Sequence, residues 1–349
     1  MPPRRPTAQD VAKLAGASRS AVSMVMNGTA DGNVAPETQE RIRRAAAALD
    51  YTPHPIAAGL RRQRSEMIGL VTDEAASSPF AGRMLSGASQ AASDRGYLTV
   101  IADAGGPGED TSHYIEELRR RRVDGLILAT TSLRTLRAPE GLRLLPSVLA
   151  NCHDEPLSLD AIMPDEYRGG REATEHLVSL GHRRITWIGG GDDVDARPLR
   201  IRGFQQALSA AGLPPGEVVP AGWDINDGFT AALPLFSAGP DRRPDAVFCA
   251  NDRVAAGALL AARTAGLAVP GDVSIMGYDD QRHLAEATVP GLTTMALPHE
   301  EIGRVAANRV VDRIEGGGPS VPAGAAPQAV LLQCRLVVRG TTGPRLPGA

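Results

Sequence analysis

The sequence predicts an N-terminal all-α helix-turn-helix domain followed by an α/β body of two lobes with parallel sheets. Three observations lead to this prediction. Positions 1–66 are basic and contain three short amphipathic helices, the remainder alternates short apolar segments with helices, and this alternation runs twice in the same order. A chain of 349 residues is long enough for such an arrangement.

The expected helices of this N-terminal segment have recognisable ends. Thr7 followed by Asp10 is typical of a capping box, and Gly16 can end the first helix in the left-handed conformation. Ser18 caps a second helix after a short turn, and Pro36 suits the first position of a third. The apolar side chains expected to pack together are Val11, Leu14, Ala15, Val22, Val25, Met26, Ile42, Ala45, Ala46 and Leu49.

The charge of the chain is unevenly distributed. Positions 1–66 carry ten Lys or Arg against six Asp or Glu, whereas the rest of the chain carries 27 against 34. A small basic segment joined to an acidic body indicates an anionic partner for the first segment alone, and nucleic acid is the obvious candidate. A chance fluctuation over so short a segment is the alternative.

Composition restricts the class of protein further. The hydrophobic fraction of 42% and the charged fraction of 22% are typical of globular domains, and no apolar run is long enough to cross a membrane. The N-terminus has no apolar secretory segment, and Cys152, Cys249 and Cys334 are too far apart for a metal site or a disulfide framework. We expect a cytoplasmic, nucleoid-associated protein with no cofactor, no metal and no membrane partner.

The body contains eight segments that predict strands. They are MIGLV, YLTVIAD, VDGLILAT and PSVLANC in the first half and RITWIGGG, EVVPAGW, PDAVFCAND and DVSIMGYDD in the second. Helices are expected near 80–95, 109–121, 168–180, 198–212, 227–237 and 253–265. A last helix near 299–314 and a strand near 330–338 complete the body.

Polar side chains follow several of these strands. In parallel sheets, ligands bind beyond the carboxyl ends of the strands. Carboxylates, amides and an indole suit a neutral polyhydroxylated ligand, and no glycine-rich phosphate motif is present. The strand-end residues are Asp73, Asp103 and Asn151 in the first half and Asp192, Trp223, Asn251 and Asp279 in the second. Asp252 is expected to cap the helix that follows it, and His182 to satisfy a local backbone group.

The N-terminal region resembles a known family. The strings TAQDVAKLAGASRSAVSMVMNG and PETQERIRRAAAALDYTPHPIAAGLRRQRSEMIGLV are similar to the DNA-binding head of LacI/GalR bacterial transcriptional regulators. The resemblance implies a helix-turn-helix domain over 1–53 and a hinge helix over 54–66. It also implies that Leu60 inserts into the minor groove, although a flexible basic linker without that wedge is the alternative.

A recognition helix presents its N-terminal side chains to base edges in the major groove. Arg19 can make a bidentate contact to guanine, worth roughly 1–3 kcal/mol of discrimination, unless it is an ordinary solvated arginine. Ser18, Ser23 and Thr38 can bond phosphates. The complete set of expected DNA contacts is Thr7, Ser18, Arg19, Ser20, Ser23, Met24, Asn33, Thr38, Tyr51 and Leu60.

Three features depart from the family pattern. Met24 stands where many relatives carry Arg, Ala35 replaces the usual Ser or Thr cap of the third helix, and the loop GTADGNVAP is slightly longer than usual. The operator sequence therefore cannot be transferred from relatives.

The family resemblance continues through EATEHLVSLGHRRI, RIRGFQQAL, FCANDRVAAGAL, VPGDVSIMGYDD and PGLTTM. It implies a two-lobed, periplasmic-binding-protein-like body over 67–340, with lobe one at about 67–165 and 297–326 and lobe two at about 166–296 and 327–340. The terminal segment TTGPRLPGA predicts a disordered tail over 341–349. Leu297 stands where several sugar-binding relatives have Gln. The implied effector-binding residues are Phe80, Asn151, Arg200, Trp223, Asn251 and Asp279.

These observations predict a homodimeric repressor. Its partners would be near-palindromic double-stranded operator DNA and a small-molecule effector, namely a carbohydrate or sugar derivative, bound between the lobes. A periplasmic-type sugar-binding protein would explain the body but not the basic head. An enzyme is not expected, because the GxSxG, HExxH, Walker and dinucleotide motifs are absent from the sequence.

Overall fold

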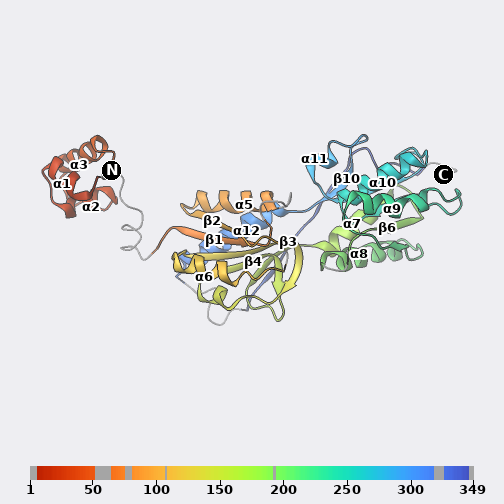
Figure 1. The fold of residues 1–349 in the computed structure, drawn as a ribbon, viewed down its shortest axis with the longest axis horizontal. Helices are drawn as coiled ribbons and strands as arrows, with labels where there is room; N and C mark the ends of the chain where they lie inside the picture. Colours follow the sequence, from red (N-terminus) through yellow and green to blue (C-terminus); the bar gives the residue numbers. More distant parts are fainter. Residues whose placement is uncertain are drawn as a thin grey trace. The chain divides into compact units, whose positions relative to one another are not determined.

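The computed structural model describes residues 6–51, 64–74, 81–106, 108–191, 194–317 and 326–345 (Figure 1). The chain divides into two compact units, Met1–Glu66 and Met67–Ala349, which we call the head and the body. Leu60, Phe80, Asp192 and most of the expected hinge helix lie outside the described residues. Among the described residues, no helix is long and apolar enough to cross a membrane.

The head consists of α1 (Ala8–Ala15), α2 (Arg19–Met26) and α3 (Pro36–Ala48), as the sequence predicted. Thr7 and Asp10 form the capping box of α1, and Gly16 ends this helix at φ 60°. The Ser18 hydroxyl accepts a hydrogen bond from the Ala21 amide at 3.1 Å. No side chain caps α3, as expected from the presence of Ala35 in place of the usual Ser or Thr cap.

Small and branched side chains form the core of the head. Val11, Val22 and Ile42 are fully buried. The sequence predicted Leu14 in this core, and that prediction is wrong, because the Leu14 side chain is 58% exposed. The buried residues of α1 are Val11, Ala12 and Ala15, so its inward face is centred close to Ala15, and Leu14 projects about 100° away from that face.

Lobe one of the body contains a six-stranded sheet in the order β11-β5-β4-β3-β1-β2. Helices α5 and α12 cover one face and α6 covers the other (Figure 1). The strands are β1 (Met67–Thr72), β2 (Leu98–Asp103), β3 (Gly125–Leu136), β4 (Ser147–Asp154), β5 (Asp160–Pro164) and β11 (Ala329–Leu332). The helices are α5 (Ala81–Asp94), α6 (Ser112–Arg120), the 3₁₀ helix η1 (Glu140–Leu144) and α12 (His299–Glu315).

Lobe two repeats this topology in the order β12-β10-β9-β8-β6-β7. Only the β10–β12 pair is antiparallel among the described strand pairs of the two sheets. The strands are β6 (Ile185–Ile188), β7 (Val218–Val219), β8 (Ala246–Cys249), β9 (Ser274–Asp279), β10 (Thr293–Ala296) and β12 (Arg335–Val337). The helices are α7 (Glu166–Ser179), α8 (Ala196–Ala210), α9 (Ile225–Phe236), α10 (Asp252–Thr264) and α11 (Arg282–Ala285). The expected repeat of two similar α/β halves is confirmed.

The C-terminal crossing between the lobes differs from the prediction. The single strand expected near 330–338 is two strands, because β11 pairs with β5 in lobe one and β12 pairs with β10 in lobe two. The second segment of lobe one therefore extends to Leu332 rather than 326. Strands β5 and β10 were also missed, since each has only a few residues and no distinctive flanking pattern.

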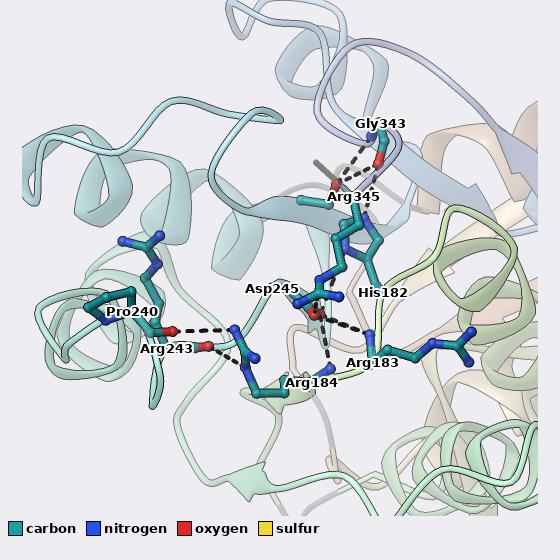
Figure 2. Close-up of polar contacts among 9 residues, drawn as sticks. His182, Arg183, Arg184, Pro240, Arg243, Asp245, Gly343 and Arg345 are labelled. Atoms are coloured by element: carbon teal, nitrogen blue, oxygen red, sulfur yellow. Dashed lines mark hydrogen bonds and ion pairs between the residues drawn. The ribbon is translucent and has the colours of Figure 1, made fainter. Parts of the chain in front are cut away.

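The predicted disordered tail is wrong for residues 341–345, which pack against lobe two (Figure 2). The Ile275 amide donates to the Thr341 carbonyl at 2.8 Å, and His182 Nε2 donates to the Gly343 carbonyl at 3.0 Å. Arg345 forms an ion pair with the buried carboxylate of Asp245 at 3.0 Å. The segment TTGPRLPGA suggested disorder, but backbone groups within 341–345 find partners far away in the sequence. The backbone bond expected for His182 is thus present, although its partner is not local.

Candidate ligand cavity and nucleic-acid interface

The body contains a cavity of about 220 Å³ lined by residues from both lobes. Leu297 and five residues named from the sequence line it together. The five are Asn151, Arg200, Trp223, Asn251 and Asp279. Topology explains three of these positions, because Asn251 and Asp279 lie at or just beyond the carboxyl ends of β8 and β9, and Asn151 lies in the second half of β4.

Arg200 is the most constrained of these side chains. It is buried on α8 and forms a two-point ion pair with Glu166, with Nε–Oε2 and Nη2–Oε1 distances of 2.7 and 2.8 Å. Its Nη1 donates to the Ala250 carbonyl at 2.7 Å, and its guanidinium lies 3.7 Å from the centre of the Tyr278 ring. Burial alone would lower the pKa of Arg200, but the Glu166 carboxylate raises it above its ordinary value. The geometry fixes this guanidinium at the cavity wall.

Asp279 lies beside Arg200, with 3.8 Å between its Oδ1 and the arginine Nη2. Its backbone has φ 110°, a value that most side chains avoid, at the end of β9. Burial raises the pKa of the Asp279 carboxyl well above its ordinary value, while Arg200 acts in the opposite direction. A carboxyl with a raised pKa can donate a hydrogen bond as well as accept one.

Asn251, rather than Asp252, caps α10, so the expected cap was misplaced by one position. Its Oδ1 accepts from the Val254 amide at 2.8 Å, and its Nδ2 donates to the Trp223 carbonyl at 3.0 Å. Asp252 is instead fully buried and accepts from the Gln281 amide at 2.7 Å and from the Thr294 hydroxyl at 2.5 Å. Burial raises the pKa of Asp252 to about 7.

The strand ends of lobe one contribute less than expected. Asn151 lines the cavity and donates from Nδ2 to the Thr130 carbonyl at 2.9 Å. Asp73 accepts from the Thr131 amide at 2.9 Å, and burial raises the pKa of its carboxyl. Asp103 accepts from the Gly105 amide at 3.0 Å. Neither of these two aspartates is among the lining residues.

Several lining residues were not found from the sequence. They are Glu74, Thr131, Ser132, Arg134, Glu166, Arg253 and His299. Arg134 reaches the cavity because β3 continues to Leu136, beyond the expected end of that apolar segment. Burial lowers the pKa of His299 to about 3, so this ring is neutral at physiological pH. Glu166 begins α7, and no local pattern connects it with Arg200.

The candidate nucleic-acid interface is the exposed face of α2. Arg19, Ser20 and Met24 are exposed there, and Met24 is 37% exposed. Asn33 is also exposed, whereas Thr7, Ser23, Thr38 and Tyr51 are half-buried. The hydroxyls of Thr7, Ser18 and Ser23 make local hydrogen bonds within the head.

A helix-turn-helix unit with an exposed second helix and a two-lobed body with a small polar cavity occur in one chain. That combination is typical of transcriptional regulators that respond to a ligand.

Comparison with known proteins agrees. Residues 7–54 match the bacterial regulatory proteins of the lacI family, and residues 65–339 match the periplasmic binding proteins and sugar binding domain of the LacI family. The chain therefore belongs to the LacI family, as the sequence motifs indicated.

Individual relatives span nearly the whole chain. The ribose operon repressor of Haemophilus influenzae is 34% identical over 311 residues, which cover 88% of this chain and 92% of that protein. A complex of the regulator CelR with cellobiose has 32% identity and a TM-score of 0.64, and the match covers 97% of this chain and 100% of that one. The lac repressor dimer bound to operator and the anti-inducer ONPF has 27% identity and a TM-score of 0.80, with the same coverage.

Proposed function

We propose that this regulator is a homodimeric, cytoplasmic repressor whose operator affinity is controlled by a small molecule bound in the cavity of the body. One observation carries the proposal. In a chain with a helix-turn-helix head, five polar or aromatic residues from both lobes line a single cavity. The operator is near-palindromic double-stranded DNA, because two heads related by twofold symmetry read two equivalent half-sites.

The head reads DNA with α2 in the major groove. Arg19 and Ser20 lie in its first turn and are exposed, so they face base edges, and Met24 one turn later offers only an apolar contact, as to a thymine methyl. The phosphate contacts that position the head come from Ser18, Ser23 and Thr38. The other proposed DNA contacts of the described head are Thr7, Asn33 and Tyr51.

The effector is a small sugar or sugar derivative. The cavity of about 220 Å³ is below the range of about 300–1,000 Å³ that drug-sized ligands occupy, which favours a monosaccharide-sized ligand. Trp223 can cover the C–H face of a sugar ring, while Asn151, Asn251 and Asp279 bond its hydroxyls. One relative is a ribose operon repressor and another is a regulator in complex with cellobiose, which supports a carbohydrate as the effector.

Control follows from the position of the cavity. A ligand that touches both lobes stabilises one arrangement of the lobes over another and can shift operator affinity by a few kcal/mol. Repression relieved by the effector is the form of control we propose.

The test is fluorescence anisotropy of the purified protein on a DNA fragment from upstream of its own operon, at several salt concentrations and with a panel of sugars. Tight, sequence-selective binding that one sugar weakens is the expected result. Binding that depends only on salt and shows no sequence preference, or a complete lack of response to ligands, would contradict the proposal.

A further inference from the structure

Two arginines that the expected sugar contacts do not include line the cavity, one from each lobe. Arg134 belongs to lobe one and Arg253 to lobe two. The Nε atom of each is buried and has no hydrogen-bond partner among the described residues. Neither guanidinium is therefore fully hydrogen-bonded within the described residues, and each can still bind an acceptor on a ligand in the cavity.

Arg134 is held where the lobes meet. It lies near the end of β3, and its two neighbours contact lobe two directly. The Asp195 amide donates to the Leu133 carbonyl at 3.1 Å, and the Thr135 hydroxyl donates to the Asp195 carboxylate at 2.8 Å. The ion pairs found among the described arginines of the body do not include Arg134. Its charge therefore remains available at the junction of the lobes.

Arg253 is the second residue of α10, the helix that Asn251 caps. The N-terminal end of a helix carries a partial positive charge, which disfavours a cation and favours an anion. The ion pair of Arg253 with Asp224, at 3.0 Å, lies at the surface, because Asp224 is 70% exposed. Such an exposed pair is weak and can be exchanged for a better one.

The carboxyl groups in and around the cavity do not neutralise both arginines. Glu166 is committed to Arg200 through two hydrogen bonds. Asp279 faces Arg200 at 3.8 Å. Asp73 accepts from the Thr131 amide and is not among the lining residues. Glu74 is the one other carboxylate among the lining residues that the structure describes, and it can offset a single positive charge.

We infer that the effector carries an acidic group, a phosphate or a carboxylate, bound between Arg134 of lobe one and Arg253 of lobe two. Both anions accept two parallel hydrogen bonds from a guanidinium. One arginine from each lobe would make the acidic group a direct link between the lobes. The inference rests on the proposed function, because it specifies the ligand of the same cavity.

Calorimetric titration of the full-length protein tests the inference. The probes are ribose, ribose 5-phosphate, glucose, glucose 6-phosphate and gluconate at equal ionic strength. We expect one acidic probe to bind at least tenfold more tightly than its neutral counterpart. The phosphates and gluconate distinguish a phosphate from a carboxylate.

Variants connect this preference to the two arginines. Arg134→Gln and Arg253→Gln are each expected to reduce the preference at least tenfold, and Arg134→Lys to keep part of it, since it retains the charge but not the planar fork. Arg120→Gln is the matched control, because Arg120 pairs with Glu117 on the surface of α6 and its side chain is 62% exposed. Operator binding without effector should be unchanged in the Arg120→Gln control.

Three results would overturn the inference. They are binding of no acidic probe, tightest binding of a neutral sugar, and an acidic preference that survives both glutamine substitutions. A neutral sugar that still releases operator would leave the proposed function intact, so the two failures are distinguishable.

Discussion

The buried Arg200–Glu166 pair is the most direct target for perturbation in this protein. Glu166→Gln keeps the size of the side chain but removes the charge that faces Arg200. The two side chains are 5% and 2% exposed, so Arg200 would keep a buried charge without its principal partner. Removing one member of a buried ion pair typically costs about 3–5 kcal/mol.

The surrounding groups place the expected cost near the lower end of that range. Arg200 would keep its hydrogen bond to the Ala250 carbonyl, and Asp279, at 3.8 Å, could ionise in place of Glu166. We therefore expect a loss of about 3 kcal/mol. In a domain of this size that corresponds to a decrease in Tm of roughly 6–12 °C.

The assay is thermal and urea unfolding of the full-length protein at one fixed protein concentration. Glu172→Gln is the matched control, because Glu172 lies on the same helix and pairs with Arg168 at the surface, where the ion pair is worth about 0–1 kcal/mol. Equal stability of the two variants would refute the argument that the Glu166 charge balances Arg200.

Three further predictions concern the head, the cavity and pH. Arg19→Ala should lower discrimination at one operator position by about 1–3 kcal/mol and leave effector binding intact, and equal affinities of both proteins for every operator variant would contradict the base contact. Asp279→Ala should abolish the effector response in anisotropy titrations but keep operator binding, and an unchanged dose-response would remove Asp279 from the site. Because burial raises the folded-state pKa of Asp252 to about 7 from 3.8, its contribution to stability is present at low pH and is lost as pH rises from about 4 to 7. In unfolding measurements, this loss of stability with rising pH should be present in the wild type and absent from Asp252→Asn. Parallel pH profiles of the two proteins would exclude it.

Local sequence signals determined much of this protein. The capping box at Thr7, the cap at Ser18 and Pro36 define the helices of the head, because each acts on backbone groups nearby in the chain. In the body, the alternation of apolar segments and helices predicted the repeated topology. Ligands bind at the carboxyl ends of parallel strands, and this rule predicted that Asn251 and Asp279 line one cavity.

Tertiary structure decided what depends on groups far apart in the chain. Glu166 and Arg200 meet because α7 and α8 pack together, and the tail reaches His182 across a sequence separation of 161. Arg134 enters the cavity because β3 runs on to the junction of the lobes, where Asp195 binds its neighbours. Periodicity and capping describe contacts along one helix or strand. A buried charge pairs with the residues that the packed core brings close to it. Its partner therefore cannot be predicted from any short segment of the sequence.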